Sequence, residues 1–435
     1  MASAKHSQQA EHKRAGSRMS KKTIIMNLTQ LPVKLEEAVS SVLSDITPEM
    51  KNSFCNILEE LFSLTLEMPG RLNYTQLERM GTHTEKTYRE AFSKEVDWAS
   101  IDEDAIFRVF SRNDDLSIVI DPSFLQKSGR CTPGAGLYWS GVAGAVRHGL
   151  EINAIGVSDV EKHDCMIVTA PMTPSPDVLK EQSISLRSWY LMTIGANKET
   201  LSKISRRITA DAYFATHDFV DGLKEMGFDI ISRLRDNICL RYIHQADPDE
   251  PVRRGARKKV DGNVDLCDPD MTVFREFRLK GDKGRFITAT VNCRALKRNV
   301  VVAIYYPEHG EPKIYFSTDL SLSGEKVVER YRLRFQIEFC IRDAKQYTGL
   351  GDSQSRKGRA LDFAVNLSFA ALNMAKLVIH KENLGISVGQ LHLIMMLTAL
   401  AFRFNSRYAE AQTSRKLAWW DQSLRKLAGA KALSA

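Results

Sequence analysis

The chain has 435 residues, of which 43% are hydrophobic and 26% charged, and this composition excludes collagen-like, low-complexity and wholly disordered proteins. Sixty-one Lys and Arg against 53 Asp and Glu give a formal net charge of +8, which favours a polyanionic partner without proving one. The seven cysteines form no CxxC pair or Cys/His cluster. This excludes a zinc ribbon and a secreted disulfide framework, so we expect reduced thiols in a cytosolic protein.

Neither end of the chain predicts export or membrane insertion. Residues 1–22 are polar and basic without an apolar stretch, which indicates a mobile tail rather than a secretory signal. Leu384–Phe402 carries no charged residue and is long enough to span a bilayer, but it contains Gly385, Gln390 and His392. We therefore expect a buried core helix there and a soluble protein.

Residues 23–110 predict an all-helical domain. Their apolar residues recur at helical spacing, as in Phe54, Leu58, Leu61 and Phe62. Residues 74–92 fit a helix, a tight turn and a second helix that Thr84 can cap. This pattern is a weak signal for a DNA-binding helix-turn-helix, in which Lys86 and Arg89 would reach phosphates or bases. A plain helical hairpin is the alternative.

Residues 111–236 predict an α/β domain. Five β-branched or alternating runs predict strands, namely Leu116–Asp121, Leu137–Val142, Leu150–Val157, Ile204–Asp211 and Phe228–Leu234. Two stretches predict helices, namely Asp177–Thr193, which begins near Pro176, and Thr216–Met226. This order of elements is typical of a mixed sheet with flanking helices.

Residues 237–320 interrupt that pattern and predict a β-rich insertion. Three runs read as strands, namely Phe286–Val291, Val300–Tyr306 and Lys313–Phe316. A basic loop in the insertion supplies candidate phosphate contacts at Arg253, Arg254, Arg257, Lys258 and Lys259. Helical periodicity returns over 321–380, which we assign to the second part of the core. The last segment, 381–435, predicts a C-terminal helical region whose Trp419-Trp420 pair fits either a dimer interface or ordinary packing.

The stretch from Tyr331 to Lys345 carries the strongest chemical signal. On one continuous helix, Tyr331, Arg334, Glu338 and Lys345 would share an arc of roughly 60°. Such a helix presents a carboxylate flanked by an aromatic hydroxyl and two cations. The alternative is an ordinary amphipathic helix in which Arg334 and Glu338 form an i,i+4 ion pair.

These four residues have the spacing Y-(2)-R-(3)-E-(6)-K, which resembles the signature of DDE-type bacterial insertion-sequence transposases of the YREK group. Ser317-Thr318-Asp319 is similar to that family's approach to the signature helix. The resemblance implies a ribonuclease H-like fold with two further acids on strands. Asp121 and Asp211 match them, 90 residues apart, and the 127 residues from Asp211 to Glu338 leave room for the family's β-rich insertion.

The resemblance also implies the chemistry of the site. Asp121, Asp211 and Glu338 would be both the catalytic residues and the ligands of two Mg²⁺ or Mn²⁺ ions, which prefer carboxylate oxygens. Tyr331, Arg334 and Lys345 would grip the phosphates at the cleaved transposon end. Arg356, in a basic loop beyond the signature, is a further candidate phosphate contact.

The family implies a transposase that binds terminal inverted repeats and target DNA, works as a homodimer, and acts in the bacterial cytoplasm at the nucleoid. A standalone metal-dependent DNA nuclease and a non-catalytic, repurposed DNA-binding protein are the alternatives. One feature departs from the best-known members, because the insertion lacks the tryptophan that stacks on a flipped base. Tyr305, Tyr306 and Tyr315 are the available aromatic platforms, or else ordinary strand residues, so a DNA hairpin intermediate is not predicted.

Overall fold

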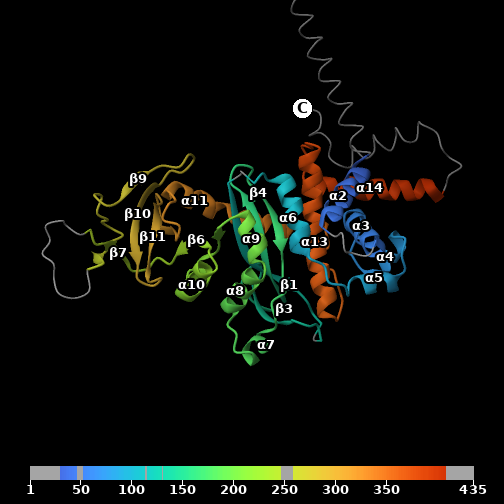
Figure 1. The fold of residues 1–435 in the computed structure, drawn as a ribbon, viewed down its shortest axis with the longest axis horizontal. Coiled ribbons are helices and arrows are strands. Elements are labelled where there is room, and N and C mark those ends of the chain that lie inside the picture. Colours follow the sequence, from blue (N-terminus) through green and yellow to red (C-terminus); the bar gives the residue numbers. More distant parts are fainter. Residues whose placement is uncertain (1–29, 47–51, 113–114, 130, 246–257, 408–435) are drawn as a thin grey trace, which may run out of the picture. The chain divides into compact units, whose positions relative to one another are not determined.

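The structure is a computed structural model that describes residues 30–46, 52–112, 115–129, 131–245 and 258–407. The chain divides into two compact units (Figure 1). Unit 1 consists of Met1–Val109 and Arg342–Ala435, and unit 2 of Phe110–Ile341. The predicted tail over 1–22, the cations Arg253, Arg254 and Arg257, and the Trp419-Trp420 pair lie outside the described residues.

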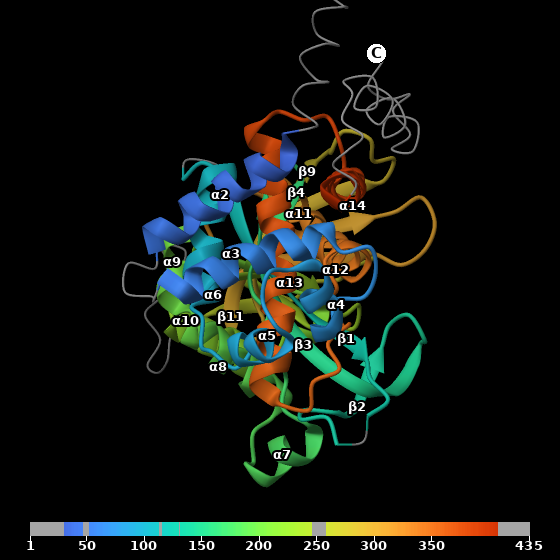
Figure 2. The same cartoon turned by 90° about the vertical axis from the view of Figure 1, so that its right-hand side faces the viewer.

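Unit 1 is helical in its described part, as expected for the N-terminal segment. Its helices are α2 (Leu31–Ile46), α3 (Asn52–Glu67), α4 (Tyr74–Met80), α5 (Glu85–Ala91), α6 (Trp98–Val109), α13 (Gly358–Lys381) and α14 (Val388–Arg407). Helix α13 packs against α2, α3, α6 and α14 and forms the centre of the unit (Figure 2). The core of unit 1 thus joins helices from both ends of the sequence.

In the described part of unit 1, α13 is the helix that is buried on nearly all sides, whereas the charge-free stretch Leu384–Phe402 is not. Among the described residues, α13 is the one helix long and apolar enough to cross a membrane, but 89% of its apolar window is buried inside the protein. A helix that is apolar on nearly all sides is typical of a core position. The charge-free stretch Leu384–Phe402 lies mostly in α14, whose Phe402 is 74% exposed. A helix is therefore present as predicted and buries Val388, Leu391, Ile394 and Met395 on one face, but it is not buried on all sides.

Helices α4 and α5 confirm the predicted helix–turn–helix arrangement of residues 74–92. The Asn73 side chain accepts a hydrogen bond from the Gln76 amide, and the Thr84 side chain accepts one from the Thr87 amide. Both residues have extended backbones, as N-caps do, and each satisfies an amide that the helix leaves unpaired.

Glu67, at the end of α3, couples the stability of unit 1 to pH. Burial raises the pKa of its carboxyl to about 7, against the opposing charge of Arg403. The ordinary pKa of glutamate is about 4.3, so the folded state holds a proton that the unfolded chain releases between about pH 4 and 7. The contribution of Glu67 to stability is therefore full below about pH 4 and is lost as the pH rises through 7.

We expect Glu67→Gln to raise the free energy of unfolding at pH 8 by on the order of 1–2 kcal/mol, with little effect at pH 4. Urea unfolding of wild type and variant across this pH range measures the difference. Glu59→Gln, on the same helix, is the matched control. An equal shift in stability at both pH values would contradict the assignment.

Unit 2 is built on one mixed sheet, which confirms the predicted α/β class. Its strands are β1 (Leu116–Gln126), β2 (Gly136–Ser140), β3 (Ala145–Asp159), β4 (Asp164–Thr169), β5 (Arg207–Thr209), β6 (Asp229–Leu234), β7 (Leu240–Ile243), β8 (Val260–Asn263), β9 (Arg275–Phe277), β10 (Arg285–Cys293), β11 (Arg298–Tyr306) and β12 (Lys313–Ser317). The order is β2-β3-β1-β5-β6-β12-β11-β10-β7-β8, with β4 beside β3 and β9 beside β10. The insertion strands therefore extend the core sheet through the antiparallel pair β6–β12.

The helices of unit 2 differ from the prediction in two places. They are α7 (Pro176–Glu181), α8 (Leu186–Ala196), α9 (Lys198–Ile204), α10 (His217–Glu225) and α11 (Gly324–Leu333), with a 3₁₀ turn at Ala212–Phe214. The single helix predicted over Asp177–Thr193 is two helices, because Ser183 has a positive φ of 56° and Ser185 caps α8. The strand predicted over Ile204–Asp211 shortens to β5, since α9 occupies the residues before it.

Helix α11 covers the insertion side of the sheet, where it contacts β6, β10, β11 and β12 (Figure 1). Together they form a hydrophobic cluster of Ile231, Phe277, Phe286, Val301, Ala303, Tyr315, Leu322, Val327, Val328 and Tyr331. This packing fixes α11 against the sheet. The end of α11 is thereby held beside the edge where β5 and β6 terminate.

Candidate active site

Asp121 lies on β1, and Asp211 lies two residues beyond the end of the adjacent strand β5, where it caps the 3₁₀ turn. Strands β1 and β5 run parallel, with Val119 opposite Thr209. Asp121 is two residues after Val119, and Asp211 is two residues after Thr209. Neighbouring strands are about 4.8 Å apart, so the two carboxylates leave the same edge of the sheet side by side.

Arg334 connects the first of these acids to Glu338. Its Nη1 lies 2.9 Å from Asp121 Oδ1, and its Nη2 lies 3.1 Å from Glu338 Oε1. The arginine side chain is only 9% exposed, whereas Glu338 is 46% exposed. One buried guanidinium therefore binds two carboxylates that are distant in the sequence. The Glu338 carboxylate remains partly exposed to solvent.

The electrostatics of Arg334 bring in the third acid. Burial, the largest effect, lowers the pKa of the guanidinium, but the charges of Asp121, Glu338 and Asp211 together raise it above its ordinary value. Burial is the largest effect that raises the pKa of the Tyr331 hydroxyl, and the charge of the Asp211 carboxylate raises it further. All three predicted acids thus act electrostatically on one cation, and two of them, Asp121 and Glu338, also form ion pairs with it.

The helix that carries the signature is not continuous, which corrects the prediction of one helix from Tyr331 to Lys345. Helix α11 ends at Leu333 and α12 spans Phe335–Tyr347. At the junction the Arg334 amide donates to the Tyr331 carbonyl and the Ile337 amide to the Arg334 carbonyl, each at 3.2 Å. These bonds reach three residues instead of four, so the chain is locally a tighter 3₁₀ turn. The expected i,i+4 pair of Arg334 and Glu338 survives the break.

Tyr331 belongs mainly to the core. It is 9% exposed, and its ring centroid lies 5.0 Å from that of Tyr315. The ring is therefore a packing element of the cluster under α11. Lys345 lies on α12 beyond Glu338 and is exposed.

The donor chemistry of the three acids suits a hard divalent cation, because all their ligating atoms would be carboxylate oxygens. In the described part of the chain, however, no three His, Cys, Asp or Glu side chains stand close enough together to hold a metal ion. The Arg334 guanidinium lies between Asp121 and Glu338 and supplies the positive charge there. Asp121, Asp211 and Glu338 therefore fit a divalent ion by the chemistry of their donor atoms, while Arg334 occupies the position between two of them in this structure.

The other predicted DNA contacts are scattered and mostly ion-paired. Lys86 is 88% exposed and lies 4.0 Å from Glu90. Arg89 binds Glu85 and stacks over the Tyr74 ring at 4.4 Å. Lys258 lies 2.7 Å from Asp261, and Lys259 and Arg356 are exposed. Lys86, Arg89 and Lys258 therefore already have acidic partners within the protein.

Asp319 lies away from the three acids. Because β12 runs antiparallel to β6, Thr318 bonds to Ile230 at the start of β6. Asp319 there accepts a hydrogen bond of 2.8 Å from Arg207, at the start of β5. The Ser317-Thr318-Asp319 stretch therefore lies at the amino ends of β5 and β6, away from the ends that carry the acids. Its hydrogen bonds connect β12 to the starts of these two strands.

The roles of two arginines were not predicted from the sequence. Arg330 is 2% exposed and pairs with Asp115, which ties α11 to the start of β1. Arg233, on β6, contributes positive charge near Tyr331. The Arg330 pair joins residues 215 positions apart, and no periodicity reveals such a pair.

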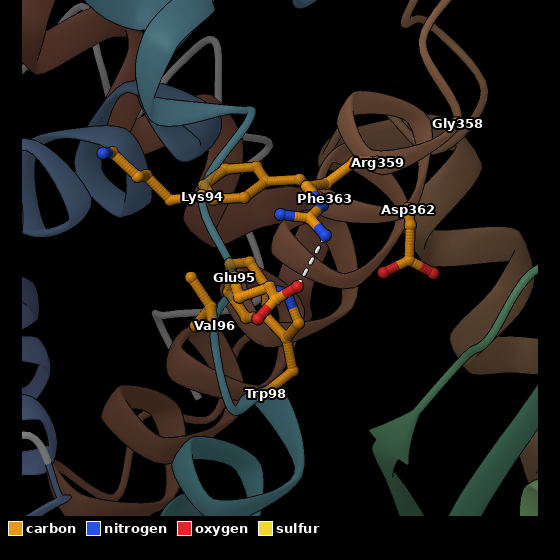
Figure 3. Close-up of a pocket in the computed structure, with 8 residues that line it drawn as sticks. All are labelled: Lys94, Glu95, Val96, Trp98, Gly358, Arg359, Asp362 and Phe363. Carbon is orange, nitrogen blue, oxygen red and sulfur yellow. Dashed lines mark ion pairs between the residues drawn. The ribbon is translucent and has the colours of Figure 1, made fainter.

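A pocket of about 370 Å³ lies within unit 1 (Figure 3). It is lined by Lys94, Glu95, Val96, Trp98, Gly358, Arg359, Asp362 and Phe363. An ion pair of 2.6 Å between Arg359 and Glu95 crosses it. None of the three acids lines this pocket.

Residues 196–374 match the family model of the transposase DDE domain. The match supports a DDE transposase and implies an enzyme of the transposase and nuclease kind, acting on DNA with divalent metal ions. It includes Asp211, Arg334 and Glu338, whereas Asp121 precedes the matched segment. The transposase DDE domain covers less than half of the chain, and no curated protein matches the chain.

Proposed function

We propose that the protein is a DDE transposase of the YREK group, which binds the terminal inverted repeats of its own element and catalyses cleavage and strand transfer. This proposal is carried by the placement of Asp121 on β1 and of Asp211 just beyond β5 at equivalent positions, together with the ion pairs by which Arg334 joins Asp121 to Glu338. The strand order β3-β1-β5-β6, antiparallel in its first pair and parallel in the others, supports a ribonuclease H-like core. The family match over residues 196–374, which include β5, β6 and Glu338, supports the same interpretation.

When bound by the three carboxylates, two Mg²⁺ or Mn²⁺ ions would activate a water and stabilise the attacking and leaving oxygens of an in-line displacement. The remaining work falls to the protein. Arg334 positions Asp121 and Glu338 before the substrate arrives. The exposed Glu338 carboxylate is accessible from solvent, and the exposed Lys345, seven residues later in the sequence, is a candidate phosphate contact.

DNA binding in this proposal involves both units. Helices α4 and α5 supply the candidate helix-turn-helix, with exposed Lys86 on α5. Each active site would act on one transposon end, so we propose a homodimer in the DNA complex. Steep weakening of binding with salt is part of the proposal, since phosphate contacts release counterions.

The deciding experiment compares wild type with Asp121→Ala on labelled duplex from the element's ends, with Mg²⁺ or Mn²⁺. Metal-dependent nicking at the element boundary, lost in the variant while binding persists, is the expected result. Products joined to target DNA distinguish a transposase from a standalone nuclease, which releases ends only. Binding without cleavage by either protein would favour a repurposed DNA-binding protein.

A further inference from the structure

A buried pair of hydroxyls links the two strands that lead to the first two acids. Ser117, on β1, and Thr209, the last residue of β5, have their side-chain oxygens 2.9 Å apart, and either hydroxyl can donate. Both residues are fully buried. Ser117 lies four residues before Asp121, and Thr209 lies two residues before Asp211. We call Ser117 and Thr209 the hydroxyl pair.

The rest of the contact between β1 and β5 is short and largely apolar. The ladder between them consists of two residue pairs, Ile118 with Ile208 and Val119 with Thr209. The three apolar members are fully buried. Apolar packing is non-directional, so it holds the strands together without fixing how far one slides along the other. A hydrogen bond has a defined distance and angle, and the hydroxyl pair therefore fixes this register.

Two further hydroxyls fix the backbone on either side of β5. Ser205, just before β5, donates at 2.9 Å to the Leu116 carbonyl at the start of β1. Ser232, buried on β6, donates at 3.0 Å to the Asp211 carbonyl. The peptide of Asp211 is thereby held to β6, while the hydroxyl pair holds β5 to β1. Side-chain hydroxyls thus determine much of the separation between Asp121 and Asp211.

Stability alone gives little reason for a polar pair at this place. The adjacent residues Ile118, Val119 and Ile208 are apolar and fully buried. Replacing both partners of a buried hydrogen bond by apolar groups of the same shape is nearly neutral or stabilising, whereas removing one partner leaves the other unpaired and is costly. A fully satisfied buried pair instead rigidifies its surroundings and specifies one arrangement.

We propose that Ser117 and Thr209 are positioning residues, which set the separation of Asp121 and Asp211 and so their capacity to bind a divalent ion. This inference rests on the proposed function. Neither hydroxyl contacts the substrate in this proposal, because both act through the strands that carry the acids. Loss of groups that orient metal ligands lowers metal affinity or activity by about tenfold to a hundredfold.

The test uses the full-length protein and measures Mn²⁺ affinity without DNA by electron paramagnetic resonance, kcat and KM for cleavage of element-end duplex, and the unfolding midpoint in urea. Thr209→Val is expected to lower Mn²⁺ affinity and kcat about tenfold each, with KM within about twofold of wild type. Thr209→Ser keeps the hydroxyl and should retain most of both. Thr288→Val is the matched control, since it removes a buried threonine hydrogen bond of 2.8 Å to the Val302 carbonyl in the insertion. It should keep wild-type Mn²⁺ affinity and kcat.

The double variant Ser117→Ala, Thr209→Val separates positioning from packing. It leaves no unpaired buried hydroxyl, so its unfolding midpoint should be higher than that of Thr209→Val, whereas its Mn²⁺ affinity and kcat should stay low. Recovery of Mn²⁺ affinity and kcat together with the midpoint would show a purely structural pair and overturn the inference. If Thr209→Val does not fold, Ser117→Ala and the double variant provide the same comparison.

Wild-type Mn²⁺ affinity and kcat in both Ser117→Ala and Thr209→Val would overturn the inference and leave the proposed function intact. An equal loss in Thr288→Val would also overturn it, because the effect would then follow from loosening the sheet anywhere. Failure of wild type to cleave element-end duplex would overturn the proposed function, and this inference with it.

Discussion

Glu338→Gln is expected to lower the rate of DNA cleavage on the order of a thousandfold or more while leaving DNA affinity within a few-fold of wild type. The amide keeps the size of the side chain and can still face Arg334, but it loses the negative charge that a divalent ion requires. Glu338 is well exposed at the acid cluster, so the substitution removes no packing. Single-turnover cleavage of element-end duplex, with Mn²⁺ in excess, measures the loss.

Glu329→Gln supplies the control, because Glu329 is an exposed glutamate on α11 whose position is outside the acid cluster. It should cleave like wild type. If Glu338→Gln retained more than about a tenth of wild-type cleavage, the acid would lie outside the catalytic set. A different carboxylate would then have to be the third acid of the site.

Arg334→Gln is expected to lower the free energy of unfolding by about 2–3 kcal/mol in the absence of divalent ions. The guanidinium is buried and lies within 3.1 Å of both Asp121 and Glu338, so its removal leaves carboxylates facing one another without a cation. The same removal frees them for metal. We therefore expect Mn²⁺ to raise the unfolding midpoint of Arg334→Gln more than that of wild type, because a ligand stabilises the state that binds it.

Urea unfolding with and without Mn²⁺ measures both effects. Arg332→Gln is the neighbouring control, since its ion pair with Asp282 involves a 43% exposed arginine and pairs of that kind contribute less than about 1 kcal/mol. Arg334→Lys keeps the charge but not the forked geometry, so it should fall between wild type and Arg334→Gln. An equal response of wild type and Arg334→Gln to Mn²⁺ would show that the guanidinium does not compete with the metal.

Local sequence patterns predicted the strands that carry the first two acids. Asp121 ends a β-branched run and Asp211 follows another, and a run of that kind is a strand whether or not its partners are known. Helical periodicity likewise predicted α10 and the helices of unit 1. The short strand β4 was missed, because six residues between turns carry little periodic signal.

The prediction failed where tertiary contacts decide the outcome. A helical wheel assumes an unbroken helix, so it put Tyr331 and Glu338 on one face and could not foresee the 3₁₀ turn at Arg334. The burial of Tyr331 depends on Tyr315 and the insertion strands, which are distant in sequence. The bridge from Arg334 to Asp121 spans 213 positions, beyond the reach of any local pattern.

The number of paired residues differs greatly between neighbouring strands of the sheet in unit 2. Strands β1 and β3 are joined over eleven residue pairs and β10 and β11 over nine, whereas β5 is joined to β1 over two pairs and to β6 over three. Asp121 and Asp211 stand on the two sides of that weak seam. Few backbone hydrogen bonds cross this seam, so it is held mainly by the packing of the buried Ile118, Val119 and Ile208, and mutations that loosen this packing should change the separation of the acids before they open either long ladder.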